Sequence, residues 1–190
     1  MQFGIGQPVP RTEDPKFLMG QAQYVDDIRL PHQAVGYVLR SPHAHAKIRS
    51  IDASAAKAAP GVALVLTGED VVADGLGPIT CHVPPMAFGG PPSPTPVHTI
   101  LVRDRVRCVG DPVAFVVAET LAQAQDAAET IGIDYEILPA VGSTRAAVAD
   151  GAPLVWEENK GNLWFEMKRG DAAATDAAFA RAAHVVKADV

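Results

Sequence analysis

The chain has 190 residues, of which 48% are hydrophobic and 20% are charged, with sixteen Lys and Arg against twenty-two Asp and Glu. This composition is typical of a globular protein, and a net charge of −6 provides no positive field to attract nucleic-acid phosphates. We therefore expect no binding to nucleic acid. No apolar run approaches the roughly 20 residues of a membrane span, and the first residues lack an export signal, so we expect a cytoplasmic protein without a membrane span. Two cysteines, Cys81 and Cys108, are too few for a disulfide framework or a four-thiolate metal site.

The first part of the chain predicts short strands and short helices. Residues 1–30 are expected to form an extended arm with turns, with strand character at 24–28. A buried strand is expected at 34–40, and a strand with one exposed face at 47–51. A helix should follow at 55–59, capped by Asp52 or Ser54 and ended by Pro60-Gly61. An interior strand is then expected at 62–66, and after it a short helix that begins with the capping box Thr67-x-x-Asp70.

A proline-rich segment at residues 75–96 interrupts this pattern. It contains seven prolines and four glycines, which exclude a helix or a central strand, because proline has no amide donor and restricts the residue before it. We expect a long loop here. Loops of this length are typically functional or ordered by a partner, so we expect this loop and the N-terminal arm to touch partner domains or to line the approach to an active site.

The second half predicts more strands and helices. Strands are expected at 99–102 and, most strongly, at 112–118, and they are followed by a helix at 120–131 and a strand at 133–138. After these, one or two helical turns are expected at 144–149 and a short strand at 153–156. The chain should then form a helix at 171–183, with Asp176 as an internal cap, and a strand at 184–190. The run 112–138 has the length of a strand-helix-strand crossover. Strands that do not alternate strictly with helices favour an α+β fold with a mixed sheet and a few short helices.

Few residues suggest chemistry. His43 and His45 are two residues apart and would share one face of an extended segment, which suits a divalent metal, but no third ligand has motif spacing. The carboxylate pairs Asp26-Asp27 and Glu13-Asp14 could seat a hard cation or act as acid and base, although solvated turns are the commoner role.

Gly4-x-Gly6 and Gly89-Gly90 lack the strand and helix that a phosphate loop needs. Cys108, flanked by Arg105 and Arg107, could be a nucleophile, but a surface thiol is the simpler interpretation. The residues alone therefore assign no catalytic, cofactor-binding or metal site.

Several motifs occur together in an order that resembles one enzyme family. They are Arg11-x-Glu13-Asp14-Pro15, Gly20-x-x-x-Tyr24-Val25-Asp26-Asp27, Ser41-Pro42-His43-Ala44-His45-Ala46, Pro60-Gly61-Val62, Thr67-Gly68-x-Asp70, Val109-Gly110-Asp111-Pro112-Val113-Ala114, Val117-Ala118-Glu119-Thr120 and Asp134-Tyr135-Glu136-x-Leu138-Pro139-Ala140. The chain resembles the N-terminal part of the molybdenum-binding large subunit of the xanthine dehydrogenase, aldehyde oxidase and aerobic carbon monoxide dehydrogenase family, at its α/β hammerhead domain. Gly170-Asp171 and the Phe179 region resemble the carbon monoxide dehydrogenase-like branch.

The resemblance implies an organisation and a function. Residues 1–20 would be an N-terminal arm, 21–140 the hammerhead domain, and 141–190 a linker and the truncated start of the molybdopterin-binding region. The intact enzyme would be an oxidoreductase that hydroxylates or oxidises a small molecule with water as oxygen source. It would carry molybdenum on molybdopterin cytosine dinucleotide and pass electrons to partner subunits with 2Fe-2S and FAD.

The family's catalytic and cofactor contacts lie downstream of the hammerhead domain, so the resemblance places none of them on this chain. We expect the fragment to be inactive alone, with the remainder of the large subunit, an FAD-binding medium subunit and an iron–sulfur small subunit as partners. An unpaired strand at its end would favour a homo-oligomer. The alternative is a stand-alone, non-catalytic hammerhead interaction module.

Overall fold

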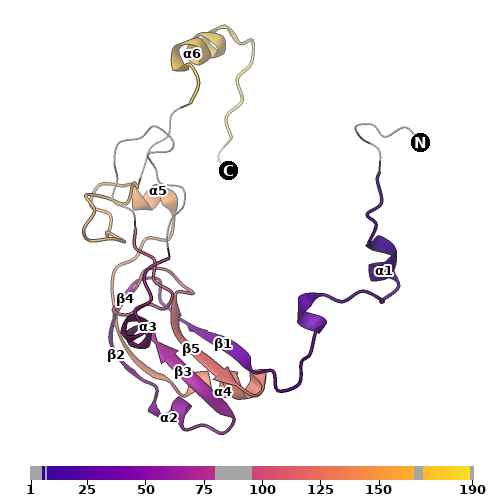
Figure 1. Ribbon diagram of the computed structural model, residues 1–190. Helices are drawn as coiled ribbons and strands as arrows, with labels where there is room; N and C mark the ends of the chain where they lie inside the picture. The colour runs from indigo at the N-terminus through magenta and orange to yellow at the C-terminus, as the bar shows by residue number, and fades with distance from the viewer. Residues whose placement is uncertain (1–5, 7, 80–95, 165–168, 189–190) are drawn as a thin grey trace. The chain divides into compact units, whose positions relative to one another are not determined.

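The computed structural model describes residues 6, 8–79, 96–164 and 169–188, and within them the fold is α+β, as predicted (Figure 1). The elements are α1 (Asp14–Leu18), a 3-10 helix η1 (Val25–Asp27), β1 (Val35–Arg40), β2 (Ala46–Asp52), α2 (Ser54–Lys57), β3 (Val62–Thr67), α3 (Gly68–Ala73), β4 (Arg105–Val106), β5 (Pro112–Ala118), α4 (Leu121–Glu129), β6 (Gly132–Ile137), α5 (Thr144–Ala147) and α6 (Ala172–Arg181). Of the helices in these ranges, none is long and apolar enough to cross a membrane.

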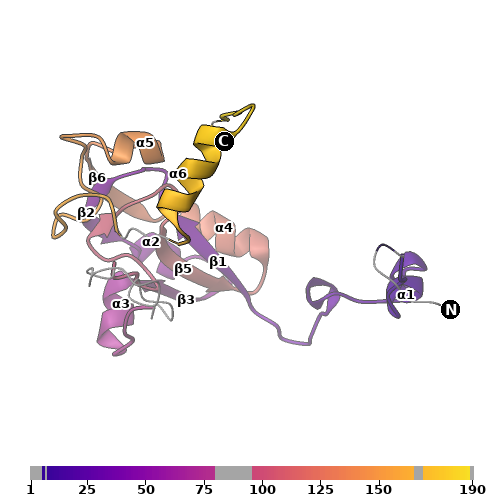
Figure 2. The same ribbon diagram turned by 90° about the horizontal axis from the view of Figure 1, so that it is seen from above.

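The first compact unit comprises Met1–Leu39, Asp52–Leu66 and Phe115–Gly132. It holds most of a three-stranded sheet in the order β1-β5-β3, beside which α4 lies (Figure 2). The central strand β5 was the strongest predicted strand, and every second residue of it from Ala114 to Ala118 is fully buried. Gly36 of β1 is required by packing, because a Cβ there would lie 2.5 Å from the ring of Phe115.

Helix α4 completes the core of this unit. The Thr120 hydroxyl accepts a hydrogen bond from the amide of Gln123, which caps the start of the helix that the sequence predicts. Ala124, Ala127 and Ala128 are buried, and α2 packs against α4. Small alanine side chains allow this close approach of the helix to its neighbours.

The second unit comprises Arg40–Ile51, Thr67–Ala114 and Ile133–Val190. Its sheet has the order β4-β2-β6, and β2 pairs antiparallel with β4 through Ala46 opposite Val106. Ala46, Val106 and Val113 form a fully buried cluster, against which the following side chains pack: Ile48, Ile51, Val102, Ile133 and Tyr135. The alternating apolar residues of the predicted strands at 47–51 and 133–138 thus supply one face of this core.

Local hydrogen bonds overturn two predicted strands. The strand predicted at 24–28 is replaced by η1 at Val25–Asp27, because the carboxylate of Asp27 accepts a hydrogen bond from the amide of Tyr24 at 2.9 Å and closes a turn. Residues 153–156 are not a strand, because the amide of Val155 bonds to the side chain of Asn162 and not to a neighbouring strand.

The order of strands in the two sheets differs from the prediction at two further places. β3 is present, but it lies at the edge of its sheet and not in the interior, and Leu64 is 46% exposed. β5 and β6 lie in different sheets, so the run 112–138 is no crossover within one sheet. The β6 side chains reach the Val106 cluster of the second unit, which places this strand beside β2.

Smaller differences occur at the ends and in the loops. The predicted arm contains the helix α1, the expected strand at 99–102 is absent, and Asp171, not Asp176, caps α6 through the amide of Ala174. Residues 184–188 contain no strand. The predicted proline-rich loop lies mainly at 80–95, outside the described residues. The described flanks of this segment meet in an antiparallel bridge between Ile79 and His98.

Candidate functional site

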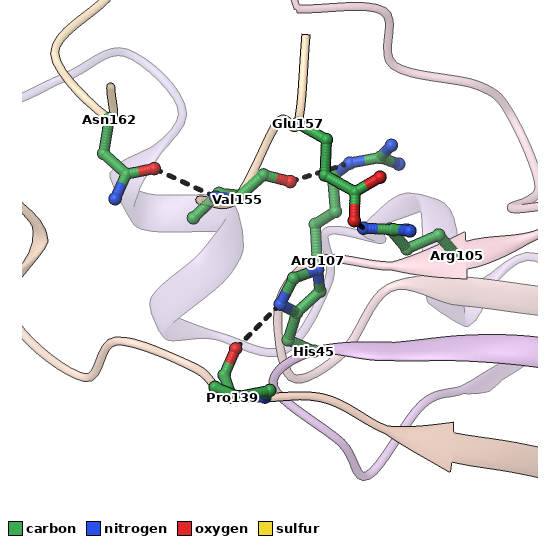
Figure 3. A network of polar contacts seen from close by, with 7 residues as sticks. All are labelled: His45, Arg105, Arg107, Pro139, Val155, Glu157 and Asn162. Atoms are coloured by element: carbon green, nitrogen blue, oxygen red, sulfur yellow. Dashed lines mark hydrogen bonds and ion pairs between the residues drawn. The ribbon is translucent and has the colours of Figure 1, made fainter. Parts of the chain in front are cut away.

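A network of polar contacts lies in the second unit, where the start of β2, the strand β4 and the segment 153–162 come together (Figure 3). Among the described residues, three polar or charged side chains are buried, and two of them, His45 and Arg105, belong to this network, with exposed fractions of 7% and 8%. Buried ionisable groups need partners, because an unpaired charge or polar atom loses its hydration. Their contacts therefore show what the network holds in place.

His45 ties the start of β2 to the chain beyond β6. Its Nδ1 lies 2.9 Å from the carbonyl oxygen of Pro139 (Figure 3). The carbonyl of His45 also accepts a hydrogen bond from the amide of Leu138 at 2.9 Å. Its Nε2 is buried, and no described residue hydrogen-bonds it. Because the contact with Pro139 occupies one ring nitrogen and the protein covers the other, the imidazole is a buried part of the packed structure.

Arg105 and Arg107 fasten the segment 153–162 to β4. The Arg105 guanidinium lies 2.7 Å from the Glu157 carboxylate, and this hydrogen bond holds the pKa of Glu157 below its usual range. The Nε of Arg107 donates to the carbonyl of Val155 at 3.1 Å, and its guanidinium lies 3.9 Å from the centre of the Trp156 ring. Burial, and then the positive charge of Arg105, lower the pKa of Arg107. The segment is thus held by charge and by stacking.

Asn162 organises the same segment from within. Its Oδ1 accepts a hydrogen bond from the amide of Val155, and its Nδ2 donates to the carbonyls of Ala147 and Pro153, each at 2.9 Å. One side chain therefore satisfies three backbone groups from positions 7 to 15 residues away. This fixes the loop that presents Trp156 to Arg107.

The structure gives separate roles to the two histidines that the sequence paired. The His43 ring packs edge-on against Tyr135, with centroids 4.8 Å apart, whereas His45 contacts Pro139. Across the described ranges, no three His, Cys, Asp or Glu side chains gather closely enough to hold a metal ion.

The acidic pairs close local turns. Asp14 bonds the amide and the side chain of Arg11, and Asp27 bonds the amide of Tyr24. Among the glycine pairs, Gly6 has a φ of +86°, while Gly4 and Gly89-Gly90 lie outside the described residues.

Cys108 is exposed, but its surroundings disfavour the reactive thiolate form. Its thiol donates to the carboxylate of Asp111 at 2.9 Å, and this interaction raises the pKa of Cys108 to about 11. Its sequence neighbours Arg105 and Arg107 bond to Glu157 and Val155 instead. Because the thiolate is the nucleophile, this environment opposes a nucleophilic role.

A pocket of about 820 Å³ lies beside this network. Its charged lining is balanced, with three arginines and three carboxylates, and two of the arginines already have carboxylate partners in Glu69 and Glu157. This lining favours neither an anionic nor a cationic small ligand. The described residues of the network thus make contacts that hold the segment 153–162 against β4.

Comparison with known proteins explains this arrangement. Residues 19–139 match the family described as aldehyde oxidase and xanthine dehydrogenase, a/b hammerhead domain. The chain belongs to this family. The recognition made from the motifs is therefore confirmed, and the polar network lies partly within this hammerhead domain and partly in the segment after it.

Two of the similar proteins are described as the large chain or large subunit of an oxidoreductase. The hammerhead chain is 38% identical over 196 residues to the carbon monoxide dehydrogenase large chain of Afipia carboxidovorans, an alignment that covers 97% of this chain and 23% of that one. It is 39% identical over 184 residues to the nicotine 6-hydroxylase large subunit of Paenarthrobacter nicotinovorans, covering 97% and 22%.

Solved structures agree with the sequence comparison. Quinoline 2-oxidoreductase from Pseudomonas putida 86 superposes with a TM-score of 0.72 at 38% identity, covering 84% of this chain and 20% of that chain. The Cu,Mo-CO dehydrogenase superposes with a TM-score of 0.69 at 36% identity, covering 95% and 23%. The hammerhead chain thus spans less than a quarter of the length of these relatives.

The sequence patterns did not identify Glu157 or Asn162 as members of this network. Neither stands in a recognisable motif, because Arg105, the partner of Glu157, is about 50 residues away, and Ala147, one partner of Asn162, lies at the end of α5. A carboxylate next to Trp156 was visible in the sequence, but only the fold shows that it meets Arg105.

Proposed function

We propose that this chain is the N-terminal hammerhead portion of the large subunit of a molybdenum hydroxylase of the carbon monoxide dehydrogenase-like branch. The intact enzyme would hydroxylate or oxidise a small substrate with water as the oxygen source. The observation that carries this proposal is the alignment of 97% of the chain with only 23% of a carbon monoxide dehydrogenase large chain.

In this proposal the chain is a frame for a site that other polypeptide completes. The contacts of His45, Arg105 and Asn162 support this role, because they hold one segment against another and leave no free acid–base pair at the network. The domain division follows the motifs: an arm at 1–20, the hammerhead domain at 21–140, and at 141–190 a linker leading toward the molybdopterin-binding region.

The chemistry of the side chains does not fit a molybdenum–pterin site on this chain. In the described ranges, no cluster of metal-ligating side chains is present, and the buried Nε2 of His45 is enclosed by protein. We therefore derive no catalytic step from these residues. Molybdenum on molybdopterin cytosine dinucleotide would be held by the remainder of the large subunit, and 2Fe-2S and FAD by partner subunits, in a cytoplasmic homo-oligomeric complex.

The test is to purify the native polypeptide that contains this chain, with its partners, and to measure its mass and its molybdenum, iron and flavin contents. We expect a polypeptide several times longer than 190 residues that carries molybdenum in a fixed ratio and co-purifies with iron and flavin. A native polypeptide that ends near residue 190 and contains no molybdenum would contradict the proposal. That result would favour the stand-alone hammerhead interaction module.

A further inference from the structure

The segment 9–30, called the docking arm, belongs to the extended region predicted at residues 1–30 and includes the predicted arm and the first residues of the hammerhead domain; it has no core of its own. No residue in it is buried. It nevertheless exposes seven large apolar side chains, which are Val9, Leu18, Met19, Tyr24, Val25, Ile28 and Leu30, with Leu18 and Val25 exposed by 87% and 84%. Scattered exposed apolar residues are normal on a protein surface, but seven within 22 residues is the density of a surface that another polypeptide covers.

Local hydrogen bonds give the arm a defined shape. Helix α1 begins where Asp14 accepts bonds from Arg11, and it ends in a Schellman motif, in which the amide of Gln21 bonds to the carbonyl of Lys16 and the amide of Gly20 bonds to that of Phe17. Gly20 is required there, because its φ is +67°.

A ring contact then joins α1 to η1. The centroids of Phe17 and Tyr24 lie 4.6 Å apart, and Asp27 fixes η1 through the amide of Tyr24. The two short helices are therefore held together while Leu18 and Val25 remain in solvent. An unfolded tail would have no such caps, so these contacts indicate a segment shaped to bind.

The length of chain outside this structure indicates what covers the arm. The Cu,Mo-CO dehydrogenase chain superposes on 95% of this chain, so only about ten residues lack a counterpart in it, fewer than the arm contains. Most of the arm is therefore shared with a large subunit of which this chain matches 23%. In such a subunit, most of the polypeptide is available to cover the arm.

We propose that the arm docks through these apolar side chains onto an apolar surface of the polypeptide that completes the large subunit. This inference rests on the proposed function, because it needs a longer chain than the 190 residues. The arm then joins the hammerhead domain to the rest of the subunit, and the burial of its apolar side chains stabilises the interface between them.

The experiment uses the complete assembled enzyme and two single variants, Leu18→Asp and Val25→Asp. Gln23→Asp is the matched control, because it places the same charge on an exposed polar position of the same arm. Hydrogen exchange of peptides covering residues 17–30 reports docking, and the molybdenum content is measured in parallel. We expect each apolar-to-Asp variant to speed exchange in these peptides roughly tenfold or more, and the control to change it less than about twofold.

Each outcome decides one way. Free-peptide exchange rates in the unmodified, molybdenum-loaded enzyme would overturn the docking proposal and leave the proposed function intact. Protection that disappears on dilution to single copies, or on removal of the iron–sulfur and flavin subunits, would also overturn it, because the arm would then be covered by a second copy or by a partner subunit. Absence of molybdenum from the native protein would instead contradict the proposed function.

Discussion

Replacing Asn162 with alanine tests whether the segment 153–162 is held by the contacts described above. The side chain satisfies three backbone groups, the amide of Val155 and the carbonyls of Ala147 and Pro153, all at 2.9 Å. A hydrogen bond contributes about 0.5–1.5 kcal/mol net to stability, so three bonds give about 1.5–4.5 kcal/mol. Because all three are only partly buried, water can replace some of them, and we expect a loss of about 2 kcal/mol.

The control for this prediction is Asn159→Ala in the same segment. The Oδ1 of Asn159 is buried, and no described residue hydrogen-bonds it, so its removal deletes an unsatisfied atom at little cost. Urea unfolding at 25 °C, followed by circular dichroism, gives the free energy of unfolding of each variant. If Asn162→Ala costs no more than Asn159→Ala, the three contacts do not hold the segment, and the positioning role assigned to Asn162 is wrong.

Three further predictions concern the thiol, a close contact and an ion pair. Because Asp111 raises the pKa of Cys108 to about 11, its thiolate fraction at pH 8 falls, and alkylation of Cys108 should be roughly tenfold slower than that of an ordinary thiol after the higher nucleophilicity of a more basic thiolate is included. Asp111→Asn should accelerate alkylation, as mass spectrometry of the labelled peptide can show. Gly68→Ala places a Cβ 2.6 Å from a backbone oxygen and should lower the unfolding free energy by about 1–3 kcal/mol, whereas Gly142→Ala, with no atom within 4 Å, should leave it nearly unchanged in the same urea titration. Arg105 lowers the pKa of Glu157, so the stability that this carboxylate contributes is present above the ordinary carboxyl pKa and is lost as the pH falls through the lowered pKa. In Glu157→Gln, the melting temperature should therefore lose this part of its dependence on acid pH. A melting profile against pH that is the same in the variant and the unmodified protein would contradict the ion pair.

The sequence predicted well those elements whose signals are local. The apolar run of β5 and the small-residue stripe of α4 carry their own periodicity, and Thr120 supplies a cap that needs no distant partner. The capping box of Thr67 and Asp70 forms as expected, with the carboxylate 2.7 Å from both the amide and the hydroxyl of Thr67. Order and spacing of motifs then identified the family, because many weak matches in sequence order are jointly specific.

Pairing between distant segments was not predictable in the same way. β4 has only two residues and no period of its own, so its existence depends on β2 presenting a free edge at Ala46. The assignment of β5 and β6 to different sheets likewise depends on packing around Val106, which no local pattern encodes. Conversely, Asp27 overrode the strand character of its neighbours, because a carboxylate three residues from a free amide closes a turn without help from the rest of the fold.

The two histidines show why spacing alone is a poor guide to a site. His43 and His45 share a face in an extended chain, but a metal needs their side chains to converge on one point with a third ligand. Tyr135 on β6 draws the first ring into an edge-on contact, and Pro139 beyond β6 takes the Nδ1 of the second. One contact comes from β6, which pairs beside β2, and the other from the chain just after β6, so the packing that builds the second sheet gives the two histidines different partners. Residues that resemble metal ligands in the sequence thus act here as packing and hydrogen-bonding groups that join β2 to β6 and to the residues after it.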